Sequence, residues 1–154
     1  MAHLDEPDPD DAHRFAPLVS AAQEVLRRAG CEPQLRSFTP AHLHALLLTD
    51  RDARLERERQ LVEADSDEIW AGLLATQNRG DRRPSFVLNS RSQTLRRLAD
   101  AGDPDLQAVA VEALYAHALV AGRHRLRPVD TAIVARALPR LIDALLERET
   151  RHGD

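Results

Sequence analysis

The stretch SFVLNSRSQTLRRLADAGDPDLQAVAVEALYAHALVAG, residues 85–122, decides how the C-terminal half of this chain can fold. It begins as a short apolar strand, passes through a polar turn, and ends in a helix that Asp103 caps and Pro104 opens. That helix has few clearly polar residues: Gln107, Glu112 and His117. These residues are five positions apart, which places each one about 140° around the helix from the one before, so they share no polar face. We therefore expect this helix to be covered on more than one side.

The last predicted helix, which Pro128 opens and which ends near Arg148, also has more apolar surface than one packing face requires. Its polar residues form a single stripe at helical spacing: Arg136, Arg140, Asp143 and Glu147. The remainder is a wide apolar face: Ile133, Val134, Ala137, Leu138, Leu141, Ile142, Leu145 and Leu146. Surplus apolar surface on two adjacent helices is typical of a partner-binding surface. The simplest partner is a second copy, which would complete a four-helix bundle. The residue pattern alone leaves ordinary buried core helices as an alternative.

The N-terminal half predicts a helix followed by short strands. Apolar residues recur at helical spacing from Ala12 to Gly30, and Gly30 is a natural helix end. Three short apolar or alternating segments predict strands: residues 33–38, 44–50 and 85–89. A charged helix is expected after Asp50. We therefore predict an α+β fold in which a small three-stranded sheet is flanked by helices and followed by a C-terminal helical pair.

The domain boundaries follow from the same periodicity. Residues 1–12 are acidic and lack apolar periodicity, which predicts a disordered tail. Residues 13–150 then form one domain, as the length of 154 residues suggests.

The composition argues against several classes of function. The net charge is −4, with 21 basic and 25 acidic residues, and every basic residue is arginine. An acidic balance gives no support for general binding to nucleic acid or membrane surfaces. The acidic start, MAHLDEPDPDD, is unlike a secretory or transit segment, and a single cysteine suits a reducing compartment. We therefore expect a cytoplasmic protein.

No group of residues has the pattern of a catalytic or metal site. His42 and His44 would face the same way on a strand, but two histidines without a third ligand are more often loop residues. Cys31 follows a helix end, where nothing activates the thiol. The arginines at 79, 82 and 83 are most simply a solvated loop. We expect no catalytic residue, cofactor or metal.

Four segments of the chain resemble the C-terminal domain of heat shock protein 90 chaperones of the bacterial HtpG type. They are LRSFTPAHLHALLLTD at 35–50, VLNSRSQTLRRLAD at 87–100, DPDLQAVAVEALYAHALVAGRHRLRP at 103–128 and VDTAIVARALPRLIDALL at 129–146. The likeness covers about residues 14 to 148 and is strongest to the divergent versions in high-GC Gram-positive bacteria. The ATPase and middle domains of that family have no counterpart in these residues.

The resemblance implies a non-enzymatic dimerisation module that also contributes to binding unfolded clients. In the family the last two long helices pair with those of a second copy. The implied interface residues are Leu106, Val109, Ala110, Ala113, His117, Val120, Val134, Ala137, Leu138, Leu141 and Leu145. The implied client-binding residues are Trp70, Leu73 and Leu74. Such a module would form a homodimer or pair with a full-length chaperone.

Two features weigh against the resemblance. The turn NSRSQTL at 89–95 lacks the proline that is typical there, and Pro139 falls inside the final helix, where it removes one hydrogen bond. The alternative function is a small helical protein- or nucleic-acid-binding domain unrelated to chaperones.

Overall fold

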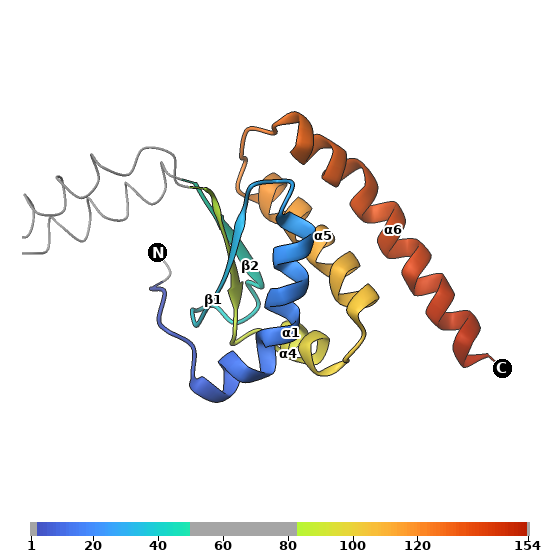
Figure 1. Ribbon diagram of the computed structural model, residues 1–154, viewed down its shortest axis with the longest axis horizontal. Helices are drawn as coiled ribbons and strands as arrows, with labels where there is room; N and C mark the ends of the chain where they lie inside the picture. Colours follow the sequence, from blue (N-terminus) through green and yellow to red (C-terminus); the bar gives the residue numbers. More distant parts are fainter. Residues whose placement is uncertain (1–2, 50–82, 154) are drawn as a thin grey trace, which may run out of the picture.

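The computed structural model describes residues 3–49 and 83–153, in which four helices accompany a three-stranded sheet (Figure 1). The elements in chain order are α1 (Pro9–Leu26), β1 (Glu32–Arg36), β2 (Ala45–Leu48), β3 (Ser85–Asn89), α4 (Gln93–Asp100), α5 (Pro104–Ala121) and α6 (Pro128–His152). The α+β class, the three strands and the C-terminal helical pair agree with the sequence prediction.

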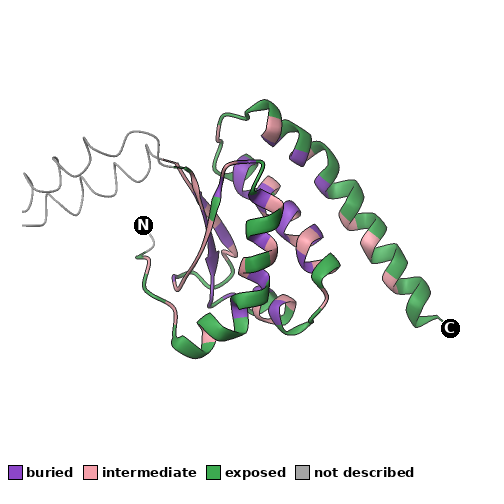
Figure 2. Cartoon of the chain, viewed as in Figure 1, coloured by how far each residue is buried: buried purple, intermediate pink, exposed green. Residues whose placement is uncertain are grey.

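The strand that comes last in the chain occupies the centre of the sheet. The order is β1-β3-β2, with β3 parallel to β1 and antiparallel to β2. Phe86 and Leu88 alternate with Val87 along β3, so both point to the same face of the sheet. That face meets α1 and α5, and the buried core lies between them (Figure 2).

The core contains few aromatic residues and many aliphatic ones. From α1 it takes Phe15, Leu18, Ala22 and Leu26, which recur at helical spacing. From α5 it takes Val111, Tyr115, Ala118 and Leu119. The rings of Phe86 and Tyr115 meet edge to face with centroids 5.7 Å apart. The helix α6 packs chiefly on α5 and contributes Ile133 to the core.

Residues 3–12 differ from the expected disordered tail. The backbones of Asp5 and Ser37 exchange two hydrogen bonds of 2.9 Å, and α1 begins at Pro9 rather than at Ala12. The Asp8 side chain accepts a hydrogen bond from the Asp10 backbone N–H. The run PDPDD thus supplies an N-cap, a proline at the first position and acidic residues in the first turn, and all three stabilise a helix start.

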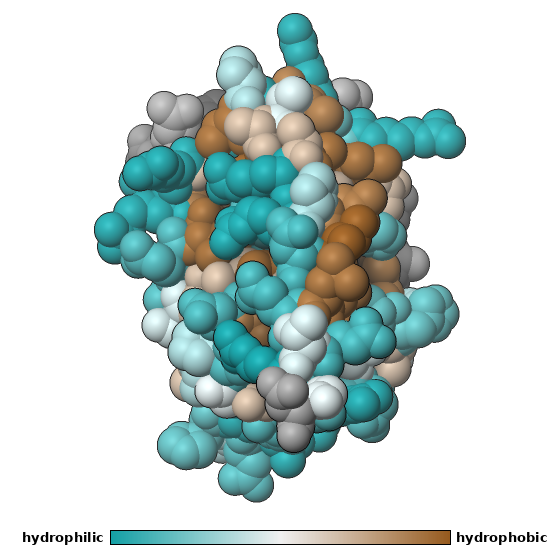
Figure 3. All heavy atoms as spheres, turned by 90° about the vertical axis from the view of Figure 1, so that its right-hand side faces the viewer, coloured by the Kyte–Doolittle hydropathy of each residue, from teal (hydrophilic) through white to brown (hydrophobic). Residues whose placement is uncertain are grey.

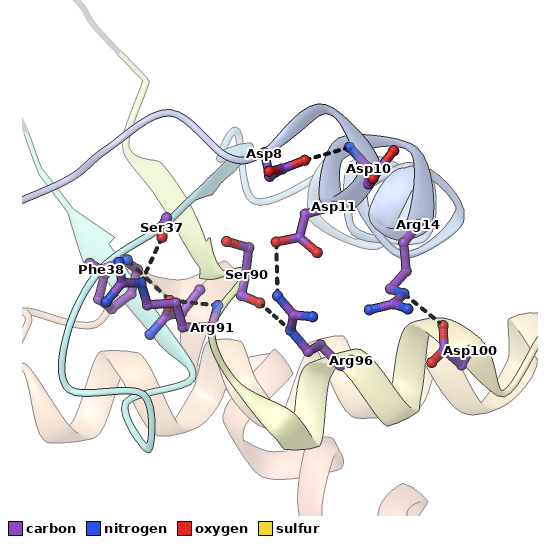
Figure 4. A network of polar contacts seen from close by, with 11 residues as sticks. Asp8, Asp10, Asp11, Arg14, Ser37, Phe38, Ser90, Arg91, Arg96 and Asp100 are labelled. Atoms are coloured by element: carbon purple, nitrogen blue, oxygen red, sulfur yellow. Dashed lines mark hydrogen bonds and ion pairs between the residues drawn. The ribbon is translucent and has the colours of Figure 1, made fainter.

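The N-terminal part of α1 is also attached to α4 by ion pairs (Figure 4). Arg96 donates to the Asp11 carboxylate at 2.9 Å and to the Ser90 carbonyl at 2.8 Å. Arg14 and Asp100 form a second pair between the two helices at 3.3 Å. These contacts add to the apolar packing between α1 and α4.

A buried asparagine fixes the loop between β1 and β2. The Asn89 side chain accepts hydrogen bonds from the backbone N–H groups of Phe38 (3.2 Å) and Arg91 (3.1 Å). It donates to the carbonyls of Leu43 (2.9 Å) and Pro40 (3.4 Å), and the Thr39–Pro40 peptide bond is cis. The end of β3 therefore holds the loop in one conformation.

Candidate interaction surface

The three polar residues of α5 each have a different environment, and these environments explain why they share no face. Gln107 is buried and donates to the carbonyls of Leu98 and Ala99, near the end of α4. Glu112 is buried and faces α6, whereas His117 is exposed. The helix is therefore enclosed by the sheet, α1, α4 and α6 and keeps one exposed strip.

Glu112 joins α5 to α6 through a buried carboxylate. Its side chain is 1% exposed and receives two half-exposed arginines that lie one turn apart on α6. Arg136 Nε donates to Oε2 at 2.9 Å and to Oε1 at 3.4 Å. Arg140 Nη1 donates to both oxygens, at 3.0 Å to Oε2. Both carboxylate oxygens are thus hydrogen-bonded, which offsets the cost of burying the charge.

A second polar network holds the start of α6. The Tyr115 hydroxyl donates to Asp130 Oδ1 at 2.8 Å, and Arg127 Nε donates to Asp130 Oδ2 at 2.8 Å. Arg127 Nη2 reaches across to the Ala29 carbonyl at 2.7 Å. Burial disfavours the ionised form of Asp130, but hydrogen bonds from Arg127 and Tyr115 hold its pKa below its usual range. Burial and the hydrogen bond to Asp130 raise the pKa of Tyr115.

The side of α6 that faces away from α5 is apolar and exposed. Ile133 and Ala137 are buried towards α5, and the polar stripe flanks them on one side. Large apolar side chains on the other side are between 48% and 64% exposed: Leu138, Ile142, Leu145 and Leu146. Figure 3 looks onto this part of the molecule and shows a hydrophobic band beside a hydrophilic one. Such a band is larger than scattered surface residues produce.

The least buried strip of α5 carries a matching row. Leu106, Ala110 and Ala113 are half-buried, and His117 and Val120 are exposed. Successive residues in this row are alternately four and three positions apart. On α6 the same alternation runs through Val134, Leu138, Leu141 and Leu145, of which Val134 and Leu141 are half-buried. An average step of 3.5 residues is the repeat of helices that pack in left-handed bundles. We call these nine residues the seam rows.

The structure thus divides the interface residues that the sequence predicts. The nine members of the seam rows retain exposed surface. Val109 and Ala137, in contrast, are 8% and 2% exposed, because they fill the contact between α5 and α6 within one chain. They therefore offer no surface to a partner. Ile142 and Leu146 are exposed, although the predicted interface omits them. Their place in the wide apolar face of the last helix was the signal that could have identified them.

A cleft of about 360 Å³ lies between the start of α5 and the C-terminal half of α6. Its apolar lining comes from Leu106, Ala108, Val109 and Ala144. Its charged lining mixes both signs: Asp103, Asp105, Arg140, Asp143, Glu147, Arg148 and Arg151. The cleft therefore presents no charge of one sign to a ligand.

The remaining candidate residues give no second site. His42 is exposed, and His44 Nδ1 lies 2.7 Å from the Ser92 hydroxyl that caps α4. Cys31 is buried, and burial raises its pKa to about 12, which leaves an inert thiol. Arg83 is exposed. The residues 70, 73, 74, 79 and 82 lie outside the described residues.

The described ranges, residues 3–49 and 83–153, also bear on metal binding and on membrane insertion. In these ranges no three or more His, Cys, Asp or Glu side chains are placed to hold a metal ion. None of the helices in the same ranges offers an apolar stretch of the length needed to cross a bilayer.

Comparisons with protein-family models, with curated proteins and with solved structures found no significant match for this chain.

Proposed function

We propose that this chain is a non-enzymatic dimerisation module in which α5 and α6 pair with those of a second copy. The observation that carries the proposal is the exposure of Leu138, Ile142, Leu145 and Leu146 on a helix whose opposite side is already packed. A partner that covers such a face stabilises the complex by about 25 cal/mol for each Å² of apolar surface removed from water.

A second copy is the partner that the seam rows favour. One chain supplies two rows with the same 3.5-residue repeat, so a two-fold axis can set the α5 row of each copy against the α6 row of the other. The product is a four-helix bundle. Pro139 does not oppose this geometry, because α6 continues through it and its side chain is exposed. Because Pro139 has no backbone N–H, the carbonyl of Ala135 lacks its helical hydrogen bond. Ala135 is exposed, so water can take the place of that donor.

The proposal extends to a module of a cytoplasmic chaperone similar to heat shock protein 90. Its support is the resemblance of four segments, which implies dimerisation through the same two helices. Client binding by Trp70, Leu73 and Leu74 stays a prediction from that resemblance.

Sedimentation equilibrium of the wild type and of Leu145→Glu tests the dimer. Leu145 is 58% exposed in the single chain, so the new charge stays out of the core unless a partner covers it. We expect the wild type at twice the chain mass of 17.2 kDa and the variant at the single mass with an unchanged helical circular dichroism spectrum. The matched control is Ala132→Glu, which places the same charge at an exposed position of α6 outside the seam rows. A wild type with the single mass at tens of micromolar would refute the proposal.

A further inference from the structure

Apolar contacts alone leave the position of α6 along α5 poorly defined. The side chains that α6 buries against α5 include Ile133 and Ala137, and the apolar face continues with Leu141. Apolar packing is non-directional. A displacement of α6 by one turn, about 5.4 Å, would still bury aliphatic side chains.

The buried carboxylate of Glu112 does not tolerate such a displacement. In the observed register it lies between Arg136 and Arg140, and both donate to it. A shift by one turn in either direction would put an alanine, Ala132 or Ala144, in place of one arginine. A buried charge that loses one of its partners is strongly destabilised. Only one register therefore satisfies Glu112 fully.

The register of the two helices decides whether a partner can bind both seam rows. A second copy meets the α5 row and the α6 row together, and a displacement of one turn would bring each residue of α6 opposite the wrong neighbour. We infer that Glu112, held by Arg136 and Arg140, specifies the dimer by fixing the register of α6 on α5 beyond its first turn, where the hydrogen bond from Tyr115 to Asp130 already holds it. This inference rests on the proposed function and adds a residue that lies outside the seam rows.

The test separates register from association. The variant Glu112→Leu removes the carboxylate and leaves two half-exposed arginines that can turn to solvent, so the chain is expected to fold. Glu112→Gln is a second variant of the same shape. The matched control is Glu147→Leu, an exposed acid on the polar stripe of α6.

Register is read from the distance between nitroxide labels at the exposed positions Asp105 and Ala135, in a Cys31→Ser background. Labelled chains are diluted into unlabelled ones so that only distances within one chain are seen. We expect one narrow distance for the wild type and Glu147→Leu, and a broadened distribution with a displaced population for Glu112→Leu. The dimer dissociation constant from sedimentation equilibrium should rise at least tenfold for Glu112→Leu and stay unchanged for Glu147→Leu.

Two results would overturn the inference: a single narrow distance in both Glu112 variants, or a displaced population with an unchanged dissociation constant. If the wild type proves monomeric, the proposed function fails by itself. The distance measurement then still decides whether Glu112 fixes the register.

Discussion

The fully buried side chain of Asn89 makes a sharp test of what holds the sheet to its loops. Asn89→Ala removes three hydrogen bonds of 2.9 to 3.2 Å and a longer one of 3.4 Å. A net contribution of about 1 kcal/mol per bond, plus the cost of leaving backbone groups unpaired, gives a loss of about 3–4 kcal/mol. The free energy of unfolding of a domain is about 5–15 kcal/mol, so this single change removes a large part of it.

The isosteric change Asn89→Asp adds a test by pH. An aspartate here would turn an oxygen towards the carbonyls of Leu43 and Pro40, which accept hydrogen bonds and repel negative charge. Burial and these carbonyls raise its folded pKa above the unfolded value of about 3.9, so the protonated form is favoured. The stability of the variant is then greatest below that value and falls as the pH rises towards 7.

Urea unfolding followed by circular dichroism at one protein concentration measures both effects. Gln93→Ala serves as the control, because Gln93 is exposed at the start of α4 and its truncation should cost less than about 0.5 kcal/mol. A loss below 1 kcal/mol for Asn89→Ala, or an Asn89→Asp variant as stable at pH 7 as at pH 4, would refute this account of the loop.

Two further predictions concern the buried groups next to α6. Tyr115→Phe removes the hydrogen bond to Asp130 and should lower the free energy of unfolding by about 1.5–3 kcal/mol. The control Thr131→Val, at an exposed position, should change it little. Equal effects of the two variants would contradict a stabilising role for the polar network around Asp130. Burial raises the pKa of Cys31, so the folded state keeps the thiol neutral. The stabilisation that results is fully present below the unfolded pKa of about 8.5 and is lost as the pH rises towards the folded pKa of about 12. Unfolding measured from pH 8 to 11 should therefore show a slope of up to about 1.4 kcal/mol per unit that is smaller in Cys31→Ala, and an identical slope in that variant would contradict the assignment.

Local signals in the sequence located most of the elements. The strand at 85–89 has the predicted bounds, because Pro84 precedes it and a polar turn follows. The start of α5 follows from Asp103 and Pro104, whose cap and ring act within a few residues. At the N-terminus the same kinds of signal, Asp8 and Pro9, mark the start of α1, which the acidic composition of residues 1–12 did not indicate.

Features that depend on distant residues could not be predicted from sequence patterns. The order β1-β3-β2 requires pairing between Glu32 and Ser85, and no periodicity encodes which strand takes the centre. The spacing of Gln107, Glu112 and His117 indicated several environments around α5 without naming them. The pairing of Glu112 with Arg136 and Arg140 depends on how α6 packs against α5. In the sequence alone the two arginines belong to a polar stripe that is typical of a solvent-exposed helix face.

The turn between α5 and α6 constrains the length of the chain at that point. Both β1 and β2 pair with a strand that follows a long connection, whereas α5 and α6 meet across a short turn between Gly122 and Arg127. A change in the length of this turn would displace Arg127 and Asp130 from the Ala29 carbonyl and the Tyr115 hydroxyl, so these hydrogen bonds constrain how many residues can join α5 to α6.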